Sequence, residues 1–205
     1  MFLAGIAVGG YLIGSIPFGL LIGKARGIDI REHGSGNIGA TNVLRIVGKP
    51  WGIACFVLDF LKGLGAVLLA WSVSGAGGSS IAGIVGAVAC VLGHNYPVWL
   101  KFKGGKGIAT SGGVLIGLLP VTALLLVVIW VTVFYTTRYV SIASIAVGVA
   151  LPVIVFVFVL TGFRADWPLF YFAFAIGVLA VWRHRTNIAR LRDGTEHRFE
   201  RRKQG

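Results

Sequence analysis

The 205-residue sequence has few charged residues, and only seven of these are acidic. Asp, Glu, Lys and Arg together make up 13% of the chain, whereas a soluble domain usually carries about 25%. Hydrophobic residues make up 56%, and the mean hydropathy is +0.86. There are too few charged residues to cover the surface of a soluble protein of this size. The sequence therefore predicts an integral membrane protein.

Other absences exclude several kinds of site. The two cysteines, Cys55 and Cys90, lie in apolar runs without CxxC spacing, so we expect no disulfide framework. The four histidines show neither HxxxH nor HExxH spacing, so we expect no metal and no other cofactor. A nucleotide-binding P-loop is excluded because Gly107 stands where that motif needs Ser or Thr after the lysine. In a membrane protein the net charge of +12 reports topology rather than nucleic-acid binding.

Long apolar segments predict an all-α bundle of about seven transmembrane helices, some short, in a single membrane domain. A hydrocarbon core of about 30 Å needs about 20 helical residues. The expected spans are 2–23, 51–73, 80–98, 107–119, 121–137, 142–160 and 168–182. Pro120 divides a run that is too long for one helix. A six-span alternative, with 107–119 re-entrant or buried against protein, stays open because so short a helix barely crosses the core.

The distribution of Lys and Arg predicts the orientation. With the N-terminus outside, nearly all cations fall in two cytoplasmic loops, 24–50 and 94–107, at Arg138, or in a basic cytoplasmic tail, 183–205. The exceptions are Arg164, which falls outside, and Lys62, which lies within a span. We expect Lys62 to pair with Asp59, three residues before it, although a proton relay is an alternative.

The unusual polar segments all fall on the predicted cytoplasmic side. Two of them, SGNIGATNVLR at 35–45 and GGKG at 104–107, combine glycines with a cation. Glycine lets backbone N–H groups turn toward a bound anion, which favours an anion site, although flexible loops with snorkelling lysines would look similar. YVSIAS at 139–144 and WRHRTNIARLRDGTEHRF at 182–199 could join the same site.

Three of these segments resemble the signature motifs of the bacterial acyl-phosphate:glycerol-3-phosphate acyltransferase family, PlsY. They are SGNIGATNVLR at 35–45, GHNYPVWLKFKGGKGIAT at 93–110 and HRTNIARLRDGTEHRF at 184–199. The resemblance implies a multi-pass enzyme of the bacterial cytoplasmic (inner) membrane with its active site at the cytoplasmic face. Such an enzyme moves a fatty acyl group from acyl phosphate to the 1-position hydroxyl of glycerol 3-phosphate. The products are lysophosphatidic acid and phosphate, in the first acylation step of phospholipid biosynthesis.

Matching the motifs residue by residue gives the expected roles. Arg45 and Lys106 should clamp phosphate oxygens. His184 and Asn187 should share one face of a helix that continues the last span. The expected catalytic residues are Ser35, Arg45, Lys106, His184 and Asn187. The expected substrate-binding residues are Gly36, Asn37, Gly39, Thr41, Asn42, Gly104, Gly105 and Ser144, with the glycine amides lining the anion site.

Several alternatives stay open at this stage. The proton of the attacking hydroxyl could pass to His184 or to a substrate phosphate, and a covalent acyl-Ser35 would lack a Ser-His-Asp relay. We expect direct transfer by a monomer that contacts membrane lipids and binds no nucleic acid. A transporter for a phosphorylated metabolite would also use cationic glycine loops, but it would place them near the bilayer midplane between repeated halves. A scaffold for anionic lipids would explain the tail but not GGKG.

Overall fold

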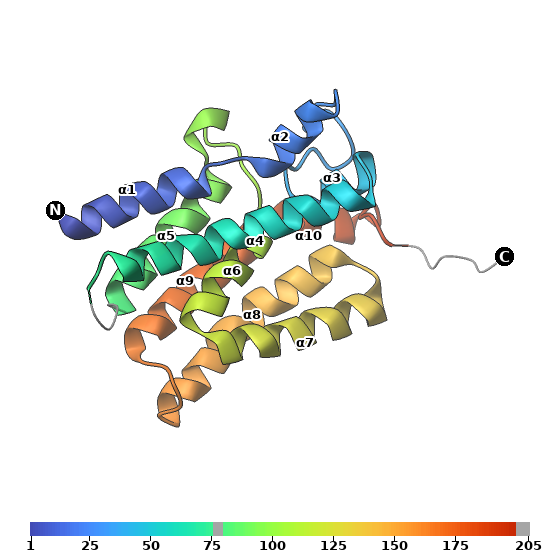
Figure 1. Cartoon of the computed structure of the whole chain (residues 1–205). Helices are drawn as coiled ribbons and strands as arrows, with labels where there is room; N and C mark the ends of the chain where they lie inside the picture. Colours follow the sequence, from blue (N-terminus) through green and yellow to red (C-terminus); the bar gives the residue numbers. More distant parts are fainter. Residues whose placement is uncertain (76–79, 200–205) are drawn as a thin grey trace. The chain divides into compact units, whose positions relative to one another are not determined.

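The computed structural model describes residues 1–75 and 80–199, so part of the predicted basic tail, residues 200–205, lies outside the described residues. Every regular element in these two ranges is helical (Figure 1). The chain forms two compact units, Met1–Pro120 and Val121–Gly205. The all-helical fold predicted from the sequence is confirmed, whereas a single membrane domain stays a prediction.

The first unit contains six α-helices among its described residues. In chain order, its elements are α1 (Phe2–Gly14), α2 (Phe18–Ala25), α3 (Ala40–Ile46), α4 (Lys49–Ser72), α5 (Ser80–Asn95), the 3₁₀ turn η1 (Val98–Leu100) and α6 (Ile108–Leu118). Helix α4 packs against α5 and α6, and α1 packs along α5. The large apolar side chains of α4 that point away from these neighbours, such as Leu61 and Leu69, are exposed, as a lipid-facing surface requires.

Glycines let the helices of this unit approach closely. A Cβ at Gly63 of α4 would collide with the carbonyl oxygen of Thr110, and one at Gly113 of α6 would collide with that of Phe60. Small residues at such contacts let the helix backbones pack closely. Within a membrane no water drives apolar surfaces together, so this close packing is what holds the helices to one another. The helix ends that carry the motif loops of this unit are thereby held on a rigid frame.

The first predicted span is broken rather than continuous. Helix α1 ends at Gly14 and α2 begins at Phe18, with Pro17 between them. Proline lacks the N–H group that a helix needs, so a break at this point leaves backbone carbonyl oxygens to find other partners. Pro152, in contrast, lies inside a helix that continues through it.

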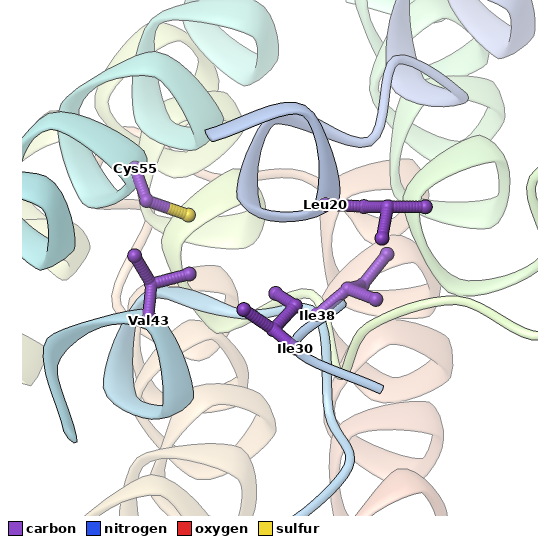
Figure 2. Close-up of a cluster of buried hydrophobic side chains, with 5 residues drawn as sticks. All are labelled: Leu20, Ile30, Ile38, Val43 and Cys55. Atoms are coloured by element: carbon purple, nitrogen blue, oxygen red, sulfur yellow. The ribbon is translucent and has the colours of Figure 1, made fainter. Parts of the chain in front are cut away.

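A small apolar cluster fixes the irregular segment that follows α2. Figure 2 shows its five side chains, which are between 0% and 4% exposed. They come from α2, the loop, α3 and α4, and are Leu20, Ile30, Ile38, Val43 and Cys55. Burying each larger aliphatic side chain stabilises this arrangement by about 1.5–3 kcal/mol. The loop that carries the first polar motif is therefore pinned on both sides of its glycines.

The second unit contains α8 (Val140–Leu160), α9 (Trp167–Arg183) and α10 (Arg185–Arg192), and it takes in nearly all of α7 (Pro120–Thr137). Helices α8 and α9 pack together where a Cβ at Gly177 would collide with the carbonyl oxygen of Gly148. Asp166 caps the start of α9 by accepting a hydrogen bond from the Leu169 amide at 3.0 Å.

Apart from the break at Pro17, the helices begin and end within a few residues of the seven predicted apolar segments. Five segments are long and apolar enough to cross a membrane. These are Phe2–Ala25, Lys49–Ser72, Ser80–Leu100, Pro120–Thr137 and Val140–Leu160. Ile108–Leu118 and Trp167–Arg183 are shorter apolar helices. Because the 11 residues of α6 extend only about 16 Å, the six-span alternative stays open, and so does the orientation of the termini.

Candidate functional site

Asn42 organises the first motif from within α3. Its side chain is 1% exposed. Its Nδ2 donates to the carbonyl oxygens of Ile30 at 2.9 Å and His33 at 3.1 Å, and its Oδ1 accepts from the Ser35 amide at 3.0 Å. We expected Asn42 to bind substrate, but the hydrogen bonds in the structure are to the loop itself. Its side chain therefore sets the position of Ser35.

The other predicted residues of this motif lie around the same turn. Ser35 and Asn37 are half-buried, while Gly36 is exposed and has φ +68°. Thr41 and Arg45 are half-buried on α3, with Arg45 in its last turn. Gly39 precedes α3 as its N-cap, and a Cβ there would lie 3.1 Å from Asn37 Nδ2. The structure thus brings the polar side chains of motif 35–45 onto one short loop and helix.

The glycines of the second motif fold back onto the end of α5. The Gly104 amide donates to the Asn95 carbonyl oxygen, and the Gly105 amide donates to that of His94, both at 3.1 Å. A Cβ at Gly105 would collide with the imidazole of His94. Gly107, the N-cap of α6, has φ +81°, a conformation that favours glycine. The GGKG loop is therefore seated directly on His94 and Asn95.

These contacts differ from one expectation of the sequence. We predicted that the amides of Gly36, Gly39, Gly104 and Gly105 would line an anion site. The Gly36 amide donates to the His33 carbonyl oxygen at 3.1 Å, so three of these four N–H groups are bonded within the chain. The glycines of the GGKG loop are needed because a Cβ would collide with a neighbouring backbone or ring. That these glycines border a substrate stays a prediction.

Lys106 combines its own charge with that of a helix end. It is half-buried and stands immediately before Gly107, and no side chain caps the N-terminus of α6. The unpaired N–H groups of a first helical turn carry a partial positive charge. A phosphate at this end of α6 would meet both the ammonium and the helix dipole.

A charged group of side chains lies buried beneath these loops. Lys62 Nζ lies 2.8 Å from Asp59 Oδ1, so the predicted pair is confirmed. His94 Nδ1 lies 3.5 Å from the same oxygen. The sequence did not predict the contact between His94 and Asp59. It pointed to His94 only through its place at the start of the second motif. Lys62 Nζ also donates to the carbonyl oxygen of Ile16 at 2.8 Å.

In the second unit, His184 lies at the junction of α9 and α10. The helix breaks at this residue, which differs from the expectation that α9 simply continues. His184 is 3% exposed, and its Nδ1 lies 2.8 Å from the Ala180 carbonyl oxygen. Because a carbonyl oxygen only accepts hydrogen bonds, Nδ1 carries the hydrogen. The neutral ring then has its lone pair on Nε2, the nitrogen that can take up a proton.

Asn187 is fixed by a carboxylate that the sequence analysis did not single out. Its Nδ2 donates to Glu196 Oε1 at 2.6 Å, and Arg190 Nε donates to Glu196 Oε2 at 2.7 Å. Burial alone would raise the pKa of Glu196, but the hydrogen bonds from Asn187 and Arg190 outweigh burial and lower it from 4.5. Glu196 is therefore held as a carboxylate that joins α10 to the segment after it.

Ser144, the remaining predicted residue, lies on α8 and is 1% exposed. Its Oγ donates to the Val140 carbonyl oxygen at 2.8 Å and accepts from Trp130 Nε1 at 3.4 Å. The hydroxyl is thus oriented by α7 and α8 within this unit.

Comparison with known proteins gives consistent matches over nearly the whole chain. A family model described as glycerol-3-phosphate acyltransferase matches residues 4–194. The glycerol-3-phosphate acyltransferase of Thermosynechococcus vestitus is 45% identical over 202 residues, covering 95% of this chain and 93% of the relative. That of Aquifex aeolicus is 46% identical over 191 residues, covering 92% and 95%.

Solved structures agree with these matches. A crystal structure of PlsY (YgiH), an integral membrane glycerol 3-phosphate acyltransferase, in its glycerol 3-phosphate form has a TM-score of 0.88 to this chain. The two are 43% identical, and the match covers 97% of this chain and 96% of PlsY. The lysophosphatidic acid form of PlsY has a TM-score of 0.85 at 42% identity and covers 97% and 95%.

The chain belongs to the glycerol-3-phosphate acyltransferase family. The resemblance carried by its three motifs is confirmed, and so is the prediction of an integral membrane protein with several apolar helices. The transporter and lipid-scaffold alternatives gain no support from any of these matches. The roles predicted for individual site residues stay predictions.

Proposed function

We propose that the protein transfers a fatty acyl group from acyl phosphate to the 1-position hydroxyl of glycerol 3-phosphate. The products are lysophosphatidic acid and inorganic phosphate, and the site faces the cytoplasm at the bacterial inner membrane. The observation that carries the proposal is the match, over 97% of the chain, to a protein solved in both a glycerol 3-phosphate form and a lysophosphatidic acid form. One protein with this fold has thus been solved in a form named for the acceptor and in a form named for the product of the same acylation.

The reaction needs little beyond positioning and charge. The 1-hydroxyl oxygen attacks the acyl carbonyl carbon, a carboxylic ester bond forms, and the bond from that carbon to the phosphate oxygen breaks. Phosphate is a stable leaving group, so the donor is already activated and no cofactor is required. Both substrates are anionic, so cations at the site bind them and neutralise charge that develops on the departing phosphate.

Arg45 and Lys106 are the proposed phosphate ligands. The planar guanidinium of Arg45 can bond two phosphate oxygens at once, whereas the ammonium of Lys106 acts as a point charge supported by the N-terminus of α6. Ser35, whose amide is held by Asn42, can hydrogen-bond a substrate oxygen. The deep burial and fixed hydrogen bonds around Asn42 keep this loop in place before substrate arrives.

Transfer is proposed to be direct, without an acyl-enzyme. The hydrogen bond that the structure describes for Ser35 runs from its backbone amide to Asn42 Oδ1. It provides no histidine held by a carboxylate, the arrangement that activates a serine nucleophile. The hydroxyl proton passes to an oxygen of the substrate phosphate or to His184 Nε2. The hydrogen bond from His184 Nδ1 to Ala180 keeps the second route available to a neutral ring.

The decisive experiment uses the purified protein in detergent or nanodiscs. Palmitoyl phosphate and glycerol 3-phosphate are mixed with it, without ATP, and lysophosphatidic acid is measured by mass spectrometry. A parallel reaction replaces palmitoyl phosphate with palmitoyl-CoA, and Lys106→Ala serves as the impaired control. Product from palmitoyl phosphate but not from palmitoyl-CoA is the expected result. Product from palmitoyl-CoA alone would overturn the proposed donor.

A further inference from the structure

The proposed reaction makes no use of the two charges buried in the middle of α4. Asp59 is 2% exposed and Lys62 is 6% exposed. Ionisable side chains are rare within membrane helices and, where they occur, usually pair with each other and serve a function. Asp59 is also within reach of the Cys55 thiol, at 3.6 Å from Oδ2. The question is what the pair holds in place.

One set of contacts leads from this pair to the first motif. Lys62 Nζ donates to the Ile16 carbonyl oxygen at the break between α1 and α2, and it lies 5.5 Å from the centre of the Phe18 ring, at the start of α2. A backbone carbonyl at a helix break inside a bilayer needs such a partner, and an aromatic face attracts a cation. At the next residue of α2, a Cβ at Gly19 would collide with the Ile38 carbonyl oxygen. Lys62 therefore fixes the helix on which the 35–45 loop rests.

A second set of contacts leads to the GGKG loop. His94 Nδ1 lies 3.5 Å from Asp59 Oδ1, and the imidazole occupies the space that a Cβ on Gly105 would need. The carbonyl oxygen of the same histidine accepts the Gly105 amide at 3.1 Å. Both the ring and the backbone of His94 thus support the residue that precedes Lys106.

We propose that Asp59 is a positioning residue for acyl transfer, whose carboxylate oxygen Oδ1 pairs with Lys62 at the α1–α2 break and contacts His94 beneath the GGKG loop. Through these two partners it sets where the first unit presents Arg45 and Lys106 to phosphate. The inference rests on the phosphate-binding roles proposed for these two cations. It assigns Asp59 no contact with substrate and no part in proton transfer.

The test must separate positioning from simple stabilisation. Removing one member of a buried ion pair leaves an unpaired charge and is strongly destabilising, whereas replacing both with apolar residues of similar size is often neutral. The variants are therefore Asp59→Leu, Lys62→Met and the double variant Asp59→Leu/Lys62→Met. Val67→Ala is the matched control, because Val67 is fully buried on the same helix and its side chain lies against Gly117, at the end of α6 opposite Lys106.

Two measurements are made on each purified full-length variant. The first is kcat and KM for glycerol 3-phosphate at saturating palmitoyl phosphate. The second is the melting temperature with and without glycerol 3-phosphate, which reports acceptor binding without any acyl donor. If the wild-type protein binds glycerol 3-phosphate but transfers no acyl group from palmitoyl phosphate, the proposed donor fails while the thermal measurement still tests the positioning of the loops.

The double variant is expected to melt near the Val67→Ala control, yet to show a KM for glycerol 3-phosphate raised about tenfold or more. Misplacing a binding group by about 1 Å can lower the rate about a hundredfold, so the loss should exceed any effect of Val67→Ala. Wild-type kcat and KM in the double variant would overturn the proposal.

His94→Gln supplies an independent result if the double variant does not fold. It removes the ring beneath Gly105 and leaves the Asp59–Lys62 pair in place. A raised KM together with a smaller glycerol 3-phosphate stabilisation supports the proposal. Wild-type values for both would contradict it.

Discussion

Removing either proposed phosphate ligand should impair the enzyme far more than it destabilises the fold. Arg45 and Lys106 are half-buried, so their charges are less screened by water than those of exposed lysines. A hydrogen bond to a charged group contributes about 1.5–3 kcal/mol, and about 1.4 kcal/mol is a factor of ten. Arg45→Ala and Lys106→Ala should therefore each lower kcat/KM by roughly ten- to a hundredfold.

The structure supplies matched controls for both changes. Lys103 and Lys49 are exposed cations close in sequence to the two ligands, so Lys103→Ala and Lys49→Ala should change kcat/KM little. Lys101 is exposed as well, so Lys101→Ala should also change kcat/KM little. Arg45→Lys should restore only part of the loss, because an ammonium cannot form the planar, two-pronged contact of a guanidinium.

The assay measures lysophosphatidic acid formation over a range of glycerol 3-phosphate and palmitoyl phosphate concentrations in matched nanodiscs. Melting temperatures of all variants are compared first, so that loss of folded protein is not mistaken for loss of activity. If Arg45→Ala and Lys106→Ala both retain wild-type kinetics, the phosphate site has been assigned to the wrong loops.

Asn42→Ala should lower the free energy of unfolding by about 2–4 kcal/mol, because three hydrogen bonds disappear and buried backbone groups lose partners. Asn42→Asp should not restore it, since a carboxylate cannot donate to the carbonyl oxygens of Ile30 and His33. Thermal unfolding measures both, and a wild-type melting temperature in Asn42→Asp would contradict the role of the Nδ2 donors. The pKa of Glu196 is lowered in the folded state, so the stabilisation that its carboxylate contributes is complete above about pH 4.5 and is lost as pH falls through the folded value. Glu196→Gln should therefore flatten the dependence of melting temperature on pH in that window. An unchanged dependence would contradict this role of the Glu196 carboxylate. Brief mixing with radiolabelled acyl phosphate should leave no label on the denatured protein, whereas label that disappears in Ser35→Ala would establish an acyl-enzyme. A protease should cleave the C-terminal tail only from the cytoplasmic side, and cleavage from outside intact cells would reverse the predicted orientation.

The positions of the helices follow from the sequence because the length of an apolar run is a local property. The division at Pro120 was predicted correctly for the same reason, since the run is too long for one helix. The break at Pro17 was not predicted. A proline can kink a membrane helix or end it, and the outcome depends on partners for the freed carbonyl groups. Here one partner is Lys62, which lies 46 positions away from Ile16 in the chain.

Site contacts between residues close in the sequence could be predicted, whereas contacts between distant segments could not. The Asp59–Lys62 pair follows from a spacing of three on one helix face, which brings the two side chains together. The contact between Asp59 and His94 joins two helices, and Glu196 meets Asn187 across the end of α10. Such contacts depend on how the chain folds back, so residue type and spacing carried no signal for them.

The glycine-rich loops show why residue type alone does not tell what a glycine does in a fold. The sequence predicts glycine amides that are exposed to an anion, yet the Gly104 and Gly105 amides donate to carbonyl oxygens of α5, and a Cβ at Gly105 would displace His94. The absence of a side chain serves close packing in this loop. In the proposed phosphate site, attraction for the anion would then come from Arg45, Lys106 and the N-terminus of α6, which no side chain caps. The buried residues beneath the loops would fix where these groups stand.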